Sequence, residues 1–314
     1  MMKEIAVPKE VLIDLYWNKN TKPREIAKLF GIKNERTVRK KMEKYGIRRK
    51  TLSEAMTINK KFSFSQNLME KAYLLGLRAG DFHAKWMKYT IRVQTSTTHP
   101  ALFDVLCNSF ENYGKACRYL YNGPHGLEWF IYVDLDNSFE FLINKPNEIP
   151  DWIIADNKLF FVFLSAYSDC EGNWHLTKSH EIHTRFTFRL RTSDKKILEN
   201  IKAKLRYLGY SPNLNIERAK GTISGYGVYS NNFYSLIIGK KEEVIMLIQN
   251  LLPHSKHNEK ITKMNYILAN RYKNFANFIT GWGELVNKIR KEKLTYKNNG
   301  TNTSVIVDNS LINT

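Results

Sequence analysis

The segments "LLGLRAGDFHA" at 74–84 and "FLSAYSDCEGNW" at 163–174 share one pattern, because in each an apolar helical stretch runs into a single acid. The acids are Asp81 and Glu171. Ahead of them, positions 72, 76 and 80 hold Ala, Gly and Gly, and positions 162, 166 and 170 hold Val, Ala and Cys. Small residues at spacing four form a ridge that lets two helix backbones approach closely. The pattern predicts two packed helices that bring Asp81 and Glu171 together.

Two carboxylates at neighbouring helix carboxyl ends repel each other and the helix dipoles. A divalent cation removes this repulsion, and oxygen ligands with open positions suit Mg²⁺, which bridges to phosphate oxygens. In phosphodiester cleavage such an ion activates water and stabilises the leaving oxygen. We therefore interpret Asp81 and Glu171 as metal ligands and not as members of a salt-bridge motif.

The chain after each acid repeats one succession of elements. Helices at 69–80 and 159–170 are each followed by two strands, a helix, two strands and a further helix. The segments "YTIRVQT" at 89–95 and "RFTFRLR" at 185–191 alternate apolar and polar residues, which predicts strands that bury the apolar set, Tyr89 included. The second pair of strands is expected at 115–121 and 127–133 in the first repeat, and at 213–220 and 226–237 in the second. The expected fold class is α+β, with two pseudo-symmetric αββαββα repeats after a small all-α domain.

The chain is strongly basic, with 49 Lys and Arg against 30 Asp and Glu and a net charge of +19. Positions 1–61 hold 17 basic and 7 acidic residues, so the charge is concentrated near the amino end. A concentrated positive field attracts polyphosphate, and nucleic acid is therefore the leading partner class. Three cysteines without a CxxC pair indicate neither a disulfide framework nor a zinc cluster. The apolar runs are too short for a membrane span and the amino end lacks a secretion signal, so we expect a cytoplasmic, nucleoid-associated protein.

The segment "EIAKLFGIKNERTVRKKMEKYGI" at 25–47 resembles the helix-turn-helix of DNA-binding regulators. Pro23 marks a helix start, Gly31 a helix end, and Asn34 a cap for the next helix. In that family the last helix enters the major groove. The resemblance implies DNA contacts by Arg36, Thr37, Lys40, Lys41, Arg48 and Arg49. A plain three-helix bundle with a solvated basic face is the alternative.

The two acid-ended segments, together with the repeated succession after them, resemble the LAGLIDADG signature of homing endonucleases. The second segment, "LSAYSDCEG", matches closely, and "LLGLRAGDF" departs more, with Phe82 where the signature usually has Gly. The resemblance implies a monomer in which two four-stranded sheets form a saddle over double-stranded DNA. It also implies Mg²⁺-dependent cleavage of both strands across the minor groove, with Mn²⁺ or Ca²⁺ as substitutes in binding, and a role in intron or intein mobility.

Roles follow from this resemblance residue by residue. Asp81 and Glu171 correspond to the catalytic metal ligands, and the carbonyls of Gly80 and Cys170 to supporting ligands. A basic residue that orders solvent corresponds to Lys240 or Lys241. The DNA-facing strand residues are Arg92, Gln94, Thr95, Lys178, Arg189, Arg191 and Thr192, with the two threonines near a water-positioning place. Arg and Gln suit base reading because they contact guanine and adenine at two points.

The domain boundaries expected from these patterns are a helix-turn-helix domain at 1–50, a linker at 51–66, repeats at 67–155 and 156–280, and a helix with a mobile tail at 281–314. Two functions stay open beside the nuclease. One is a non-catalytic, DNA-binding transcriptional regulator on the same scaffold. The other is an intron maturase that binds structured RNA.

Overall fold

The computed structural model describes residues 7–19, 21–51, 61–98, 100–123, 126–179, 183–224, 227–272 and 275–302. The chain divides into two compact units, residues 1–60 and 61–314, which are described separately. Within the described residues, no helix combines the length and the apolar character that crossing a membrane requires.

The first unit is a small helical domain whose elements are α1 (Lys9–Ile13), the π-helical η1 (Asp14–Asn18), α2 (Pro23–Leu29) and α3 (Glu35–Lys44). Pro23 opens α2, and Gly31 leaves it with a φ of 64°. The side chain of Asn34 caps α3 by accepting a hydrogen bond from the Arg36 amide at 2.8 Å. These three local expectations are confirmed. A separate core holds the unit together, formed by Val7, Leu12, Tyr16, Ile26, Ala27, Val38, Met42 and Ile47.

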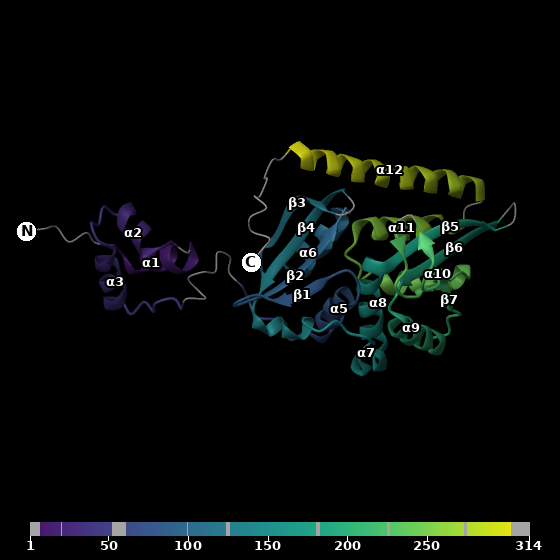
Figure 1. Ribbon diagram of the computed structural model, residues 1–314, viewed down its shortest axis with the longest axis horizontal. Helices are drawn as coiled ribbons and strands as arrows, with labels where there is room; N and C mark the ends of the chain where they lie inside the picture. The colour runs from purple at the N-terminus through teal and green to yellow at the C-terminus, as the bar shows by residue number, and fades with distance from the viewer. Residues whose placement is uncertain are drawn as a thin grey trace, which may run out of the picture. The chain divides into compact units, whose positions relative to one another are not determined.

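The second unit contains two repeats built around two four-stranded antiparallel sheets (Figure 1). The first repeat consists of α5 (Leu68–Ala79), β1 (His83–Trp86), β2 (Ile91–Thr97), α6 (Pro100–Phe110), β3 (Ala116–Gly123), β4 (Gly126–Leu135) and the 3-10 helix η2 (Asn137–Leu142). The second consists of α8 (Asn157–Glu171), β5 (Gly172–Ser179), β6 (His183–Thr192), α9 (Lys195–Tyr207), β7 (Asn213–Arg218), β10 (Phe233–Ile238) and α10 (Lys241–Leu251). The strand orders β1-β2-β4-β3 and β5-β6-β10-β7 correspond. The predicted α+β class and the duplicated succession are confirmed.

Four further elements lie between or after the repeats. They are α7 (Asp151–Ala155), the two-stranded hairpin of β8 (Ile223–Ser224) and β9 (Gly227–Val228), α11 (Asn258–Asn270) and α12 (Phe275–Asn302). The aromatic side chains Phe186, Tyr266, Phe278 and Trp282 pack together and hold the start of α12 against α11 and β6.

The two repeats meet along α5 and α8, which pack against each other lengthwise (Figure 1). A Cβ atom added at Gly76 would lie 2.5 Å from the Phe163 carbonyl oxygen and 2.8 Å from the Ala166 Cβ. Real Cβ atoms do not approach so closely, so the absence of a side chain at Gly76 is what permits this helix spacing. The predicted ridge of small residues is confirmed.

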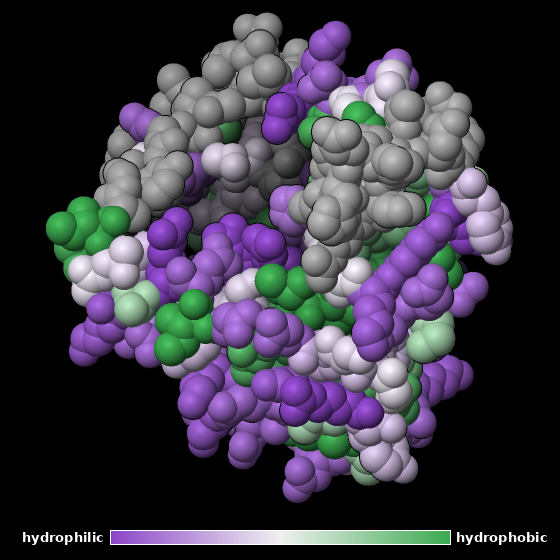
Figure 2. Space-filling view, turned by 90° about the vertical axis from the view of Figure 1, so that its right-hand side faces the viewer, coloured by the Kyte–Doolittle hydropathy of each residue, from purple (hydrophilic) through white to green (hydrophobic). Residues whose placement is uncertain are grey.

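One continuous core extends from the first repeat to the second. It lies between the helices and one face of each sheet, because strand residues alternate: Ile91, Val93, Phe188 and Leu190 are buried. The opposite faces carry the polar and aromatic residues of the strands. Seen from the side of the second repeat, the described surface is mainly hydrophilic, with hydrophobic residues in separate patches (Figure 2).

Several boundaries differ from expectation. Tyr89 is 40% exposed, because it lies in the turn before β2 and not in the strand. The strand expected at 226–237 is shorter, since β8 and β9 form a hairpin before β10 begins at Phe233. Residues 61–66 are not a linker: the Phe62 amide donates to the Tyr113 carbonyl oxygen and Phe64 is buried in the core. Helix α12 begins at Phe275, ahead of the expected boundary at 281, and continues through residues expected in a tail; residues 303–314 lie outside the described residues.

Candidate active site

The two predicted acids lie at adjoining helix ends. Helix α5 ends at Ala79 and is capped by Gly80, and α8 ends at Glu171. A Cβ atom added at Gly80 would lie 2.4 Å from the Cys170 Cβ, so the two backbones touch one residue before each acid. Asp81 and Glu171 therefore both follow directly after the contact between Gly80 and Cys170. The structure brings together the four residues that the resemblance assigned to the metal site.

Electrostatics at this point are unfavourable for two ionised carboxyls. Burial raises the pKa of Glu171 to about 8, with further upward contributions from the charges of Asp81 and Asp194, while Lys260 and Lys145 act in the opposite direction. Burial raises the pKa of Asp81 as well, while the charges of Lys260 and Lys145 act in the opposite direction, and part of the residue is exposed to solvent. Two ionised carboxyls at this point would therefore carry more negative charge than their surroundings compensate.

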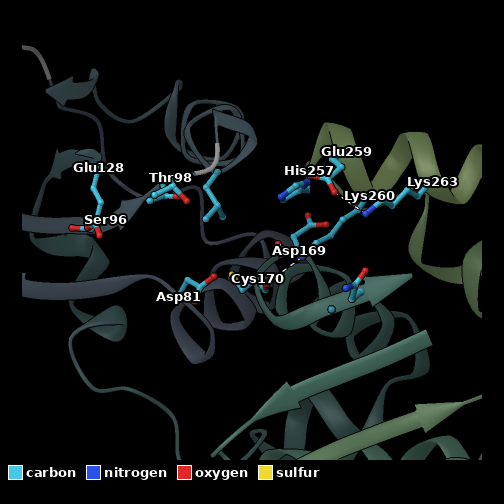
Figure 3. Close-up of a pocket in the computed structure, with 14 residues that line it drawn as sticks. Asp81, Ser96, Thr98, Glu128, Asp169, Cys170, His257, Glu259, Lys260 and Lys263 are labelled. Carbon is cyan, nitrogen blue, oxygen red and sulfur yellow. Dashed lines mark hydrogen bonds and ion pairs between the residues drawn. The ribbon is translucent and has the colours of Figure 1, made fainter. Parts of the chain in front are cut away.

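Lys260 reaches this point from α11 (Figure 3). Its ammonium donates hydrogen bonds to the last carbonyl oxygens of α8, those of Ser168 at 2.6 Å, Cys170 at 3.1 Å, and Asp169. The side chain as a whole is half-buried, and burial of its ammonium lowers the pKa of Lys260. Lys260 therefore caps the carboxyl end of the helix that delivers Glu171.

Asp169, which is 2% exposed, anchors the same helix end by hydrogen bonds from three directions. It accepts from the Tyr73 hydroxyl of α5 at 2.8 Å, from the Ser255 hydroxyl, and from the Lys256 amide at 2.8 Å. Burial raises the pKa of both Asp169 and Tyr73. The bond from Tyr73 ties α5 to α8 close to the acids.

A cavity of about 830 Å³ opens beside Asp81. Its walls come from the carboxyl end of α8, the end of β2 with the following residues, and the first turns of α11 (Figure 3). Its lining includes the carboxyl residues Asp81, Glu128, Asp169 and Glu259, the lysines Lys260 and Lys263, and Thr98 with its hydroxyl. Carboxyl residues outnumber lysines in this lining, so the cavity by itself favours a cation over a phosphate group.

On the other side of the acids, Lys145 and Asp194 form a second polar group. The Lys145 ammonium lies 3.0 Å from Asp194 Oδ2. Thr192, a predicted water-positioning residue, is buried and its hydroxyl lies 3.3 Å from Asp194 Oδ2. Asp194 thus links Thr192 and Glu171, because it contacts the Thr192 hydroxyl and its charge acts on Glu171. Thr95 is half-buried, and its hydroxyl lies 3.5 Å from the Ser96 carbonyl oxygen.

The predicted basic residues, Lys240 and Lys241, are not among the residues that line the cavity beside Asp81. The Lys240 ammonium lies 3.0 Å from Glu243 Oε1 and 2.8 Å from the Ser211 hydroxyl, ahead of α10. Lys241 is the first residue of α10. The lysines whose charges act on both acids are Lys260 and Lys145.

Of the strand residues expected to face DNA, Arg92, Gln94, Arg189 and Arg191 alternate with buried residues and lie opposite the core, but their side chains differ in availability. Thr95 and Thr192 share the parity of the buried Val93 and Leu190, so the prediction that these two threonines face DNA is wrong. Arg92 makes a two-point bond to Asp134 on β4, at 2.8 and 2.9 Å, and lies 4.1 Å from the Tyr132 ring centre. Arg191 makes a two-point bond to Glu217 on β7. Neither guanidinium is free in this conformation. Lys178 belongs to β5, and its side chain lies outside the described residues.

Gln94 and Arg189 have unused polar atoms on the same two faces. The Gln94 Oε1 and the Arg189 Nε are enclosed and have no hydrogen-bond partner among the described residues. Burial, followed by the positive charges of Arg189, Lys263 and Arg191, lowers the pKa of His175 on β5. The outer face of the second sheet therefore has a positive field.

In the first unit, Arg36, Thr37 and Lys40 lie exposed on α3, opposite the buried Val38 and Met42. Lys41 is half-buried. The Arg48 guanidinium stacks 4.8 Å from the Trp17 ring centre. Arg49 pairs with Glu43. One face of α3 thus presents the basic and hydroxyl groups that the helix-turn-helix resemblance assigned to DNA.

The donor set at the acids fits a divalent cation only in part. Two carboxylates with raised pKa values, from two different helices, suit a hard cation. Within the described part of the chain, no group of three or more His, Cys, Asp or Glu side chains is arranged to hold a metal ion, so further ligands would be carbonyls, water or phosphate oxygens. The Cys170 carbonyl, one of the predicted ligands, already accepts a hydrogen bond from Lys260.

Lys260, Lys145 and Asp194 were not predicted from the sequence. Lys260 is separated from Cys170 by 90 positions, and no local pattern marks it among the lysines of α11. The only available signal was the Ser-Asp pair at 193–194, which is typical of a helix start and places an acid at the end of β6.

Two αββαββα repeats, joined by packed helices that each end in an acid, define the fold of the LAGLIDADG homing endonucleases, and this chain has that fold. A scan against protein-family models gives no match, and a comparison with curated proteins gives none either. Among solved structures, the chain is similar to I-DmoI in complex with DNA and Ca, with 18% identity over 59% of this chain and 90% of that one, at a TM-score of 0.39.

Two other solved structures are similar as well. The homing endonuclease I-WcaI, bound to its DNA recognition sequence, has 13% identity over 63% of this chain and 88% of that one, at a TM-score of 0.46. The N-terminal LAGLIDADG domain of WhiA has 12% identity over 60% of this chain and 86% of that one, at a TM-score of 0.38.

Proposed function

We propose that the protein is a site-specific, metal-dependent endonuclease that cuts double-stranded DNA and acts as a monomer in the cytoplasm or nucleoid. The observation that carries this proposal is the meeting of Asp81 and Glu171 at touching helix ends, beside a cavity that contains ammonium and hydroxyl groups. A protein that only binds DNA gains nothing from two acids that face a phosphate. The net charge of +19 supports a nucleic acid as the partner.

In this proposal Asp81 and Glu171 hold Mg²⁺. When bound, the ion supplies Lewis-acid activation of water and stabilises the charge on the leaving oxygen. The rigid contact of α5 with α8 holds both carboxyls in place, and Lys260 and Lys145 offset part of their charge. Hydroxyl groups such as that of Thr98 lie across the cavity and would orient a phosphate or a water.

DNA recognition is assigned to the outer faces of the two sheets. Gln94 and Arg189 alternate with the buried residues of β2 and β6 and so lie on these faces, and their side-chain types suit base edges in the major groove. The exposed face of α3, with Arg36 and Lys40, would add contacts through the first unit.

A non-catalytic, DNA-binding regulator is the second candidate. One observation favours it: the Cys170 carbonyl is engaged by Lys260, so the metal site lacks one of the ligands expected for it.

The deciding experiment uses duplex DNA made by joining the sequences that flank the coding region of this protein. Wild type is incubated with this DNA and Mg²⁺, Mn²⁺ or Ca²⁺, beside Asp81→Asn and Glu171→Gln. We expect cleavage with Mg²⁺ or Mn²⁺, binding without cleavage with Ca²⁺, and at least about a hundredfold loss of rate in each variant. Binding without cleavage under every condition would favour the regulator, and tighter binding of structured RNA than of duplex DNA would favour a maturase.

A further inference from the structure

Lys260 lies on α11, which follows both repeats in the chain, and yet its ammonium is at the centre of the acid site. It donates hydrogen bonds to the carbonyl oxygens of Ser168, Asp169 and Cys170. Carbonyls at a helix carboxyl end carry a partial negative charge, and a cation at this position stabilises the helix end. Glu171 is the next residue along the chain. The ammonium therefore lies where the negative potential of the α8 carbonyls and that of the nearby acids reinforce each other.

The geometry also brings Lys260 close to Asp81. Its hydrogen-bond partner Cys170 touches Gly80 directly, and Gly80 precedes Asp81. Asp81 and Lys260 line the same cavity (Figure 3). The positive charge of Lys260 thus acts on both carboxyls from the position of the Cys170 carbonyl, in addition to that of Lys145.

We propose that Lys260 is a positioning residue with a second role: its ammonium is a resident counter-charge that holds the end of α8 and the two acids in place without metal, and it competes electrostatically with a divalent cation. The inference rests on the proposed metal-dependent function. It predicts that Lys260 weakens metal binding while stabilising the metal-free protein. A lysine that merely packed against α8 would stabilise the protein and leave metal affinity unchanged.

Two substitutions separate the charge from the hydrogen bonds. Lys260→Gln removes the positive charge, but its amide still donates to the carbonyls of α8. Lys260→Met removes both. Lys260→Arg keeps the charge. The control is Lys19→Gln in the first unit, where an exposed ammonium pairs with Asp14 at 2.8 Å.

The experiment is calorimetric titration of the full chain with Ca²⁺, combined with thermal unfolding in a chelator. Lys260→Gln and Lys260→Met are expected to bind Ca²⁺ about tenfold more tightly than wild type, because the opposing charge is gone. Lys260→Arg and Lys19→Gln are expected to stay within about threefold of wild type. In chelator, Lys260→Met is expected to melt on the order of 5 °C lower, and Lys260→Gln less so.

Two results would overturn the proposal without affecting the metal site. In the first, Lys260→Gln binds Ca²⁺ no more tightly than wild type does. In the second, Lys260→Arg binds Ca²⁺ as tightly as Lys260→Gln does. If Lys260→Met does not fold, these two comparisons still decide. Asp81→Asn with Glu171→Gln identifies a failure of the proposed function. If that double variant binds Ca²⁺ as wild type does, the acids hold no metal, and both the proposed function and the role of Lys260 fail.

Discussion

Glu171 is protonated in the folded, metal-free protein over a range of pH in which a free glutamate is ionised. Its pKa is about 8 because of burial and of the charges of Asp81 and Asp194, against an ordinary value of 4.5. The folded state therefore binds a proton more tightly than the unfolded state between these two values. A group whose pKa is raised by folding contributes stability that is present at low pH and is lost as the pH rises.

This gives a prediction for unfolding without metal. Between pH 5 and pH 8 in a chelator, the free energy of unfolding of wild type is expected to fall by about 3 kcal/mol relative to Glu171→Gln, after allowance for partial solvent access. Urea unfolding at several pH values measures both proteins. Parallel curves for the two would contradict the assignment of the titration to Glu171.

Two arginines with the same role in the resemblance have different surroundings. The guanidinium of Arg92 is held by Asp134 and the Tyr132 ring, whereas the Nε of Arg189 has no hydrogen-bond partner among the described residues. An arginine that must break an ion pair before it contacts a base contributes less to binding than a free one.

We expect Arg189→Ala to weaken binding of the target duplex by about 1–2 kcal/mol. The double variant Arg92→Ala with Asp134→Ala removes an ion pair with no net charge. It is expected to change the free energy of DNA binding by less than about 0.5 kcal/mol. Fluorescence anisotropy at fixed salt measures both. Equal losses would mean that Arg92 leaves Asp134 when DNA binds.

Among the elements, the pair of α5 and α8 determines the geometry of the site. The helices are close because Gly76 and Gly80 have no side chains at the contact, and the Tyr73 to Asp169 bond adds a polar link. The acids follow directly at the helix ends, so a change in helix spacing moves both of them. Packing in the middle of the helices is thus coupled to the positions of the two carboxyls at their ends.

Gly76→Ala tests this coupling. Its new Cβ would meet the Phe163 carbonyl oxygen at 2.5 Å, and such overpacking costs about 1–3 kcal/mol. We expect thermal unfolding to show this loss together with a slower cleavage rate. Gly283→Ala in α12 is the control, since a Cβ there has no neighbour within 4 Å and alanine favours a helix. The control is expected to be neutral or slightly stabilising, and an equal loss in both variants would contradict the argument.

For the whole molecule, basic charge is divided between two units that are separate in the structure. The first unit presents Arg36 and Lys40 on the exposed face of α3, and the second has Arg189 on the face of β6 opposite the core. Contacts between basic side chains such as Lys40 and DNA phosphates raise the affinity for any DNA sequence, and their strength depends on the salt concentration.

We expect Lys40→Ala to weaken DNA binding to the same degree on target and unrelated duplexes, and to reduce the slope of log K against log salt by about 1. Lys9→Ala, on α1, is the control and is expected to leave the slope unchanged. Titrations at several salt concentrations measure this. A loss confined to the target duplex would instead indicate that Lys40 reads bases.

Local patterns were sufficient for most of the fold. The spacing of small residues in 72–80 and 162–170 predicted the helix pair, and period-two alternation predicted β2 and β6, since both depend on neighbours within one element. Ends of elements were less predictable. Tyr89 fits the alternation of β2 but lies in the turn before it, and α12 extends across a boundary that composition suggested.

The acids of the site followed from the same local patterns, because each one ends a patterned helix. Their partners did not. Lys260 contacts Cys170 from 90 positions away, and Arg92 is held by Asp134 from a strand 42 positions away. Such ion pairs and helix caps depend on how distant elements pack. The sequence contains many lysines and aspartates, and no local pattern distinguishes the ones that form these contacts. The sequence by itself therefore determined which segments form helices and strands and where the two acids stand, because these depend on neighbours along the chain. Only the tertiary structure decided which lysine lies beside the acids, because that depends on how distant elements pack.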